Sequence, residues 1–118
     1  MSANKKKATP DLSIIIVHRN GVELLRDCLV SLPKGTEGLS TQVIVIDNGS
    51  VDGSPEMVRE EFPHVELVSV MMNLGFTRGN NRGLQMARGR YVCLLNNDTQ
   101  CCQNAFAPAI EWLEKNED

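Results

Sequence analysis

Residues 91–99 read YVCLLNNDT, so that an apolar run is followed directly by two amides, a carboxylate and a hydroxyl. The apolar run predicts a strand that is covered on both faces. The oxygen atoms of the Asp98 carboxylate and of the amides before it are of the kind that Mg²⁺ and Mn²⁺ prefer. The stretch therefore predicts a strand of a parallel sheet with a polar site at its carboxyl end.

Two other predicted strands end in the same way. The apolar residues 12–17 are followed by HRNG at 18–21, and the apolar residues 42–46 are followed by DNGS at 47–50. Asp and Asn also begin ordinary turns, so either segment alone would support a site only weakly. Three apolar strands that end in polar, glycine-bearing turns together indicate a ligand site.

Segments with helical spacing separate the predicted strands. Strands are expected at residues 12–17, 42–46, 65–70 and 91–95, and helices at 22–32, 55–62, 77–88 and 105–115. Pro33 and Gly35 are expected to stop the first helix, Ser54 to cap the second and Thr77 to cap the third. Gly79 and Gly83, inside the third helix, predict either a closely approaching neighbour or loose packing.

Strands that alternate with helices predict a mostly parallel α/β sheet, joined by right-handed crossovers and covered by helices on both faces. With strand order 3-2-1-4, the order reverses between the first and fourth strands, and such sheets bind ligands at that reversal. This order would bring His18, Arg19 and Asn20 beside Asn97 and Asp98. Asp47 would lie one strand away, so the three polar strand ends would form one crevice.

Length and composition fit a single domain. Residues 1–10, which include Lys5–Lys7, predict a disordered tail with a weak anionic-surface contact as the alternative, and residues 11–118 predict the folded domain. The net charge of −3 does not suggest nucleic-acid binding. Because neither a signal peptide, a transmembrane segment nor a disulfide framework is evident, we expect a cytoplasmic protein.

Two kinds of nucleotide site are excluded because the sequence lacks their motifs. The turn after the first strand has one glycine, whereas a dinucleotide site would have three, and the phosphate-binding motif G-x-x-x-x-G-K-[ST] does not occur. A nucleoside diphosphate-sugar with a divalent cation does fit. Asp47 can accept from the imide N–H of uracil or thymine, Asn97 can bond a ribose hydroxyl, and Asp98 can hold a cation that bridges two phosphates. The alternative is that these side chains satisfy only their own turns.

At these positions the chain resembles the family 2 glycosyltransferases, which are inverting enzymes of the GT-A fold, and most closely their rhamnosyltransferase-like branch. The resemblance covers residues 11–112 and rests on the order and spacing of five motifs. These are DLSIIIV at 11–17, DNGS at 47–50, NLGF at 73–76, GNNRG at 79–83 and LLNNDT at 94–99.

The resemblance implies a donor site at matching positions. Asn97-Asp98 stands in place of the family's D-x-D-type motif, which makes Asp98 the metal ligand for Mg²⁺ or Mn²⁺, and Asp47 matches the base-reading aspartate. Where Arg19 stands the family usually carries an aromatic residue, and a planar guanidinium can stack in the same way. The expected donor-binding residues are His18, Arg19, Asn20, Asp47, Asn73, Gly75, Arg78, Asn97 and Asp98.

The implied function is inverting transfer from a UDP- or dTDP-sugar to a glycan or lipid-linked acceptor. Full domains of this family are longer, and their later half supplies the acceptor pocket and the catalytic base. We therefore expect this chain to be the N-terminal, nucleotide-binding half of a truncated GT-A domain, inactive alone, without a catalytic residue of its own. A bared sheet edge would favour a homo-oligomer. The full protein is expected in the cytoplasm or peripherally at the inner face of the membrane. The alternative is a non-catalytic nucleotide-sugar-binding or assembly module.

Overall fold

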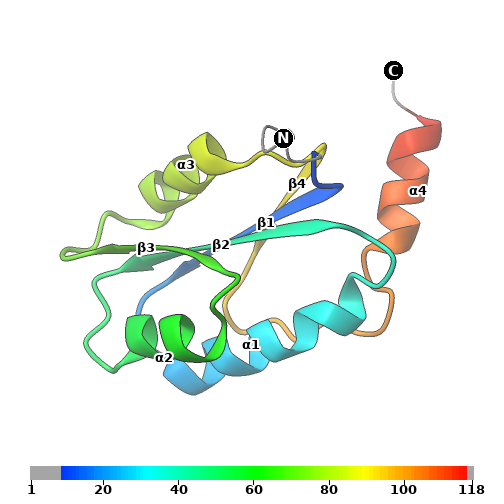
Figure 1. Cartoon of the computed structure of the whole chain (residues 1–118). Helices are drawn as coiled ribbons and strands as arrows, with labels where there is room; N and C mark the ends of the chain where they lie inside the picture. Colours follow the sequence, from blue (N-terminus) through cyan, green and yellow to red (C-terminus); the bar gives the residue numbers. More distant parts are fainter. Residues whose placement is uncertain (1–8, 117–118) are drawn as a thin grey trace, which may run out of the picture.

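The computed structural model describes residues 9–116 and contains a four-stranded parallel sheet in the order β3-β2-β1-β4 (Figure 1). The strands are β1 Leu12–His18, β2 Thr41–Asn48, β3 Glu66–Val70 and β4 Tyr91–Leu95. The predicted strand order and parallel pairing are confirmed. The tail predicted for residues 1–10 lies outside the described residues except for its last two.

Helices cover both faces of the sheet, as predicted. They are α1 Val22–Gly35, α2 Ser54–Glu61, α3 Phe76–Met86 and α4 Ala107–Lys115. Figure 1 shows α1 and α2 on one face and α3 on the other. The segment before α4 is joined to the end of α1, because the Phe106 N–H donates to the Gly35 carbonyl at 3.1 Å.

Alternating side chains of the strands form two separate cores. Ile14 and Ile16 of β1 pack with the apolar side of α1 and α2 in the larger core, which also contains Ile110 of α4. Ile15 packs with two β2 isoleucines in the smaller core, on the face that α3 covers. Both faces of β1 are therefore buried, which explains why its sequence is continuously apolar rather than alternating.

The two glycines inside α3 allow this helix to lie close against β1. A Cβ atom at Gly79 would lie 2.8 Å from Val17 Cγ1, and one at Gly83 would overlap Ile15 Cγ2. Ile15 is fully buried, so it has no free space into which it could withdraw. Close approach of a neighbouring element, rather than loose packing, accounts for these glycines.

We predict that Gly83→Ala destabilises the fold by about 1–3 kcal/mol, because overpacking against Ile15 outweighs the better helix propensity of alanine. Urea unfolding followed by circular dichroism measures this change. Gln85→Ala is the matched control on the exposed side of the same helix, and it should leave the midpoint nearly unchanged. A Gly83→Ala protein as stable as the control would contradict the close packing.

Six predicted helix boundaries are wrong by one to three residues, and among them the ends of α2 and α3 come one and two residues earlier than predicted. α1 continues through Pro33 to Gly35, since a proline in the last turn removes a single N–H. α2 and α3 follow Gly53 and Gly75, whose positive φ angles of 90° and 86° set the chain direction, so neither Ser54 nor Thr77 is the cap. α4 starts at residue 107, because a turn closed by the Ala105 N–H and the Cys102 carbonyl precedes it.

The edge strand β4 exposes apolar side chains on the face that α3 covers elsewhere. Val92 and Leu94 are 43% and 51% exposed, and Leu94 is the register partner of the buried Ile15. An exposed apolar strand can promote association, and the homo-oligomer stays a prediction.

Between residues 9 and 116, the structure contains no helix with the length and hydropathy needed to span a bilayer.

Candidate functional site

The polar ends of β1, β2 and β4 meet on the face of the sheet that carries α1 and α2. His18 and Asp47 are register partners, and they continue the inward-facing rows of the larger core beyond its last apolar residues. Both strands are longer than predicted, because these polar residues still pair within the sheet. The Asn97 side chain lies beside His18, with 2.9 Å between Asn97 Nδ2 and His18 Nδ1. The predicted juxtaposition of three strand ends is therefore present.

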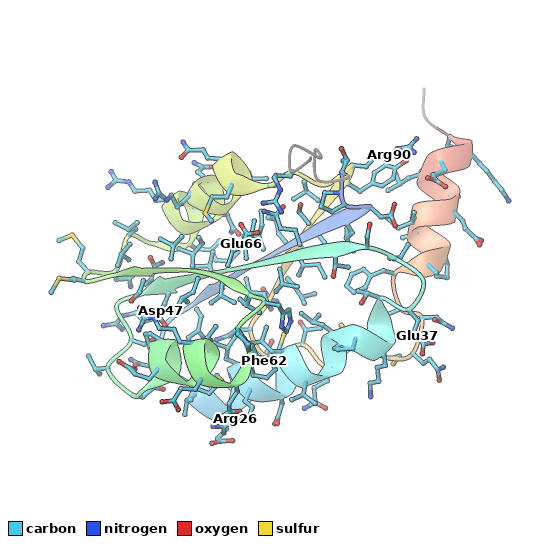
Figure 2. The ribbon with its side chains drawn as sticks, in the orientation of Figure 1. Arg26, Glu37, Asp47, Phe62, Glu66 and Arg90 are labelled. Atoms are coloured by element: carbon cyan, nitrogen blue, oxygen red, sulfur yellow. The ribbon has the colours of Figure 1, made fainter. Side chains whose placement is uncertain are left out.

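Asp47 is buried, with one carboxylate oxygen satisfied and the other not. Its side chain is 1% exposed, and Oδ1 accepts the Ser50 N–H at 2.8 Å. Oδ2 is buried without a hydrogen-bond partner among the described residues. Figure 2 shows Asp47 between the sheet and α2. Buried carboxylate oxygens are normally paired, so Oδ2 is suited to accept a hydrogen bond from a ligand.

A pocket of about 290 Å³ lies at the carboxyl ends of β2 and β3. It is lined by the turn that follows β2, by α2 and by the end of β3, namely Gly49, Ser50, Val51, Pro55, Glu56, Arg59, Ser69, Val70 and Met71. Ser50 also holds Asp47 through its backbone N–H. The turn that orients the buried carboxylate thus forms one wall of the pocket.

Asn20 links the turn after β1 to the turn after β2. Its backbone has a φ of 57°, its N–H donates to Ser50 Oγ at 2.8 Å, and its Oδ1 accepts the Val51 N–H at 2.9 Å. The side-chain oxygen of Asn20 is therefore used within the protein. The structure explains why an asparagine suits this position, and its predicted contact with a donor stays a prediction.

Asp52 joins the beginnings of α1 and α2 by hydrogen bonds. This role was not predicted from the sequence. Its Oδ2 accepts the N–H groups of Gly21 and Val22 at 2.6 and 3.0 Å, and its Oδ1 accepts the Ser54 N–H and hydroxyl at 3.1 and 2.6 Å. The hydroxyl bond is the main cause that lowers the pKa of Asp52 to about 2. The available signal was an aspartate two residues before a serine, a pattern that forms such turns.

His18 is enclosed between α2 and the turn after β4. The side chain is 1% exposed, and its Nε2 lies 2.9 Å from Ser54 Oγ. Burial lowers the pKa of His18, although the carboxylates of Asp47 and Asp52 act in the opposite direction. His18 is therefore neutral at pH 7 and contacts both α2 and the turn after β4.

The predicted residues of the loop before α3 lie on the other side of the sheet. Asn73 Oδ1 accepts the Gly75 N–H at 2.8 Å, and Asn48 Nδ2 donates to the Gly75 carbonyl at 3.1 Å. Asn48, which the sequence prediction left out, thus fixes this loop to the end of β2. Arg19 and Arg78 are exposed, and neither forms an ion pair with another residue of the described chain.

Asp98 is an exposed carboxylate in a turn that the Thr99 N–H closes onto the Asn96 carbonyl at 3.1 Å. Residues 9–116 contain no group of three or more His, Cys, Asp or Glu side chains that could enclose a metal ion. A single carboxylate nevertheless fits Mg²⁺ or Mn²⁺ that is held jointly with the phosphates of a ligand, which is how Mg²⁺ commonly binds. The donor set suits a cation that arrives with a diphosphate.

Comparisons with known proteins agree with the motifs. Residues 13–118 match the family model described as glycosyl transferase family 2. The "uncharacterized glycosyltransferase YibD" of Escherichia coli K12 is 34% identical over 96 residues, which are 79% of this chain and 27% of that protein. The chain thus spans about a quarter of the length of this relative.

Solved structures share the fold. The mannosyltransferase PcManGT from Pyrobaculum calidifontis, in complex with GDP-Man and Mn²⁺, superposes with a TM-score of 0.75 at 25% identity over 90% of this chain and 33% of that one. S. aureus TarS 1–349, in complex with UDP-GlcNAc, gives a TM-score of 0.77 at 21% identity over 91% and 32%. The sheet order 3-2-1-4 is common to the predicted GT-A fold and the observed structure. The family model covers nearly all of the sequence, and the chain therefore belongs to glycosyl transferase family 2.

Proposed function

We propose that this chain forms the donor-binding part of an inverting glycosyltransferase that uses a UDP- or dTDP-sugar and Mg²⁺ or Mn²⁺. The observation that carries the proposal is the buried, unpartnered Oδ2 of Asp47, whose Oδ1 is bonded to a turn that lines a pocket at the carboxyl end of the sheet. Binding a base N–H there would replace an unsatisfied buried acceptor by a hydrogen-bonded one. Residues 11–118 form the domain in this proposal.

The other residues have roles that follow from their places at the strand ends and at the start of α3. Asn97 bonds the ribose, Arg19 stacks on the base, and Arg78 at the start of α3 adds positive charge for the diphosphate. Asp98 would hold the cation, which when bound offsets the negative charge of the leaving diphosphate. The proposal draws support from PcManGT and TarS, whose structures contain GDP-Man with Mn²⁺ and UDP-GlcNAc.

Transfer itself would be a single displacement at the anomeric carbon, with a carboxylate base that activates a hydroxyl of a glycan or lipid-linked acceptor. We assign no such base among residues 9–116. Glu114 on α4, for example, is paired with Arg90 at 3.3 Å. We therefore expect the isolated chain to bind donor without transferring sugar, and we place the whole protein in the cytoplasm or at the inner membrane surface.

Isothermal titration calorimetry with UDP, dTDP, GDP and ADP tests the proposal. In Mn²⁺, UDP or dTDP should bind at least about tenfold more tightly than in EDTA, because the cation would neutralise diphosphate charge at Asp98. Absence of binding for all four nucleotides in Mn²⁺ would refute donor binding. Equal affinities for GDP and UDP would refute the pyrimidine preference and leave donor binding in place.

A further inference from the structure

A continuous chain of hydrogen bonds connects the beginning of α1 to the turn after β4. It runs from the backbone of Gly21 and Val22 to Asp52, from Asp52 to Ser54, and from Ser54 through His18 to Asn97. His18 joins Ser54 to Asn97 in this chain. Both His18 and Ser54 are buried, with exposed fractions of 1% and 0%. The protonation state of His18 therefore decides how the Asn97 end of the chain is oriented.

The direction of each bond follows from Asp52. The pKa of Asp52 is about 2, so at neutral pH its carboxylate only accepts, and the Ser54 hydroxyl donates its proton to Oδ1. Ser54 Oγ must then accept from His18 Nε2–H. A neutral imidazole carries one proton, so His18 Nδ1 is an acceptor and receives an N–H of the Asn97 amide.

This arrangement fixes the Asn97 amide, with its nitrogen toward His18 and Oδ1 on the other side. We propose that His18 is a positioning residue for the donor, whose neutral Nε2–H form makes Asn97 present an acceptor oxygen to the ribose. The inference rests on the proposed function and adds a residue that controls its ribose contact. His18 does not itself touch the donor in this proposal, because it is enclosed by Ser54 and Asn97.

Protonation of His18 would reverse the contact. Nδ1–H would then face the Asn97 amide N–H, two donors would meet, and the amide would have to rotate and turn its nitrogen toward the ribose. The charged groups that act on His18 are Asp47 on β2 and Asp52 before α2, while the turn after β4 presents the neutral Asn97. Burial outweighs both carboxylates and keeps the pKa of His18 below 6.5.

Two variants of His18 distinguish the roles of its two ring nitrogens. His18→Asn places an amide oxygen near the position of Nδ1 and keeps an acceptor for Asn97, whereas His18→Gln reaches the position of Nε2 and keeps the contact with Ser54. In Mn²⁺ at pH 7.5, His18→Asn should bind UDP within about threefold of wild type, and His18→Gln should bind about tenfold more weakly. Urea midpoints identify any loss of fold. Equal affinities of the two folded variants would overturn the proposal.

The pH dependence gives a second readout. UDP affinity of the wild type should fall as the pH drops through the pKa of His18, which burial holds below its ordinary value, because the acceptor form of His18 is lost as it gains a proton. His18→Asn cannot titrate at this position, so its pH profile records every titration other than that of His18. The ratio of wild-type to His18→Asn affinity should therefore fall as the pH is lowered through the midpoint of the His18 titration. A constant ratio would count against control by His18.

Nitrogen NMR of the protein without nucleotide tests the arrangement independently of donor binding. His18 should show a protonated Nε2 and an unprotonated Nδ1, and the Asn97 side-chain amide signal should shift with the same midpoint as His18. A protonated Nδ1 at pH 7.5, or an Asn97 signal that ignores the His18 titration, would overturn the inference. If the protein bound no nucleotide, the proposed function would fail, and the NMR result would still decide whether His18 fixes Asn97.

Discussion

Asp98→Ala should abolish the metal-dependent part of nucleotide binding and leave the fold unchanged. Asp98 is exposed in a turn that a backbone bond between Thr99 and Asn96 closes, so truncating its side chain removes no packing. It is the only carboxylate to which we assign the cation. Without it, the diphosphate would have to bind with its charge uncompensated. In Mn²⁺ the variant should therefore bind UDP only as weakly as the wild type does in EDTA.

Calorimetric titration of UDP with and without Mn²⁺ measures this effect, and a urea midpoint verifies the fold. Asp27→Ala is the matched control, because it also removes an exposed carboxylate but lies on α1. It should retain the full difference between Mn²⁺ and EDTA. If Asp98→Ala and Asp27→Ala gave equal titration heats in Mn²⁺, the metal would have to bind elsewhere.

The sheet could be predicted from the sequence because its signals are local. Each strand is a short apolar run that ends in polar residues, and the intervening helical spacing requires parallel crossovers. With the order 3-2-1-4, which the resemblance to GT-A enzymes implies, these features also predict the juxtaposition of His18 and Asn97, and the structure contains both. Donor contacts of the individual side chains stay predictions, since they depend on a ligand.

The features that the sequence did not reveal depend on contacts between distant residues. The Asp52-to-Ser54 turn has a local signal, but Asp52 also accepts the N–H groups of residues about thirty positions earlier, and no local motif predicts that contact. Asn48 likewise donates to the distant carbonyl of Gly75. The starts of α2 and α3 were misplaced for a related reason. Gly53 and Gly75 set the chain direction through positive φ angles, where a side-chain cap was expected.

The unsatisfied oxygen of Asp47 could be recognised only in the structure, and it suggests a trade between stability and binding. A buried carboxylate oxygen without a partner destabilises a fold, and natural proteins tolerate such groups mainly where a ligand completes them. Oδ1 stabilises the fold by accepting the Ser50 N–H, whereas Oδ2 accepts no hydrogen bond from the described residues. The two oxygens of one side chain therefore have separable roles.

Asp47→Asn should separate these roles. Its amide oxygen can still accept the Ser50 N–H, so we expect the free protein to be at least as stable as wild type in urea. Its amide nitrogen would stand where Oδ2 stands and would meet the base N–H donor to donor. Losing a hydrogen bond to a charged acceptor costs about 1.5–3 kcal/mol, so UDP should bind roughly 10–150-fold more weakly.

The control is Asp47→Ala, which removes both oxygens. It should weaken UDP binding to a similar extent and also lower the urea midpoint, because the Ser50 N–H loses its partner. Titrations of both variants with UDP and GDP in Mn²⁺ distinguish the base contact from general damage to the site. Normal UDP binding by a folded Asp47→Asn protein would show that Oδ2 does not read the base. Loss of GDP binding equal to the loss of UDP binding would show that it reads an N–H common to both nucleotides, because either base can donate to a carboxylate.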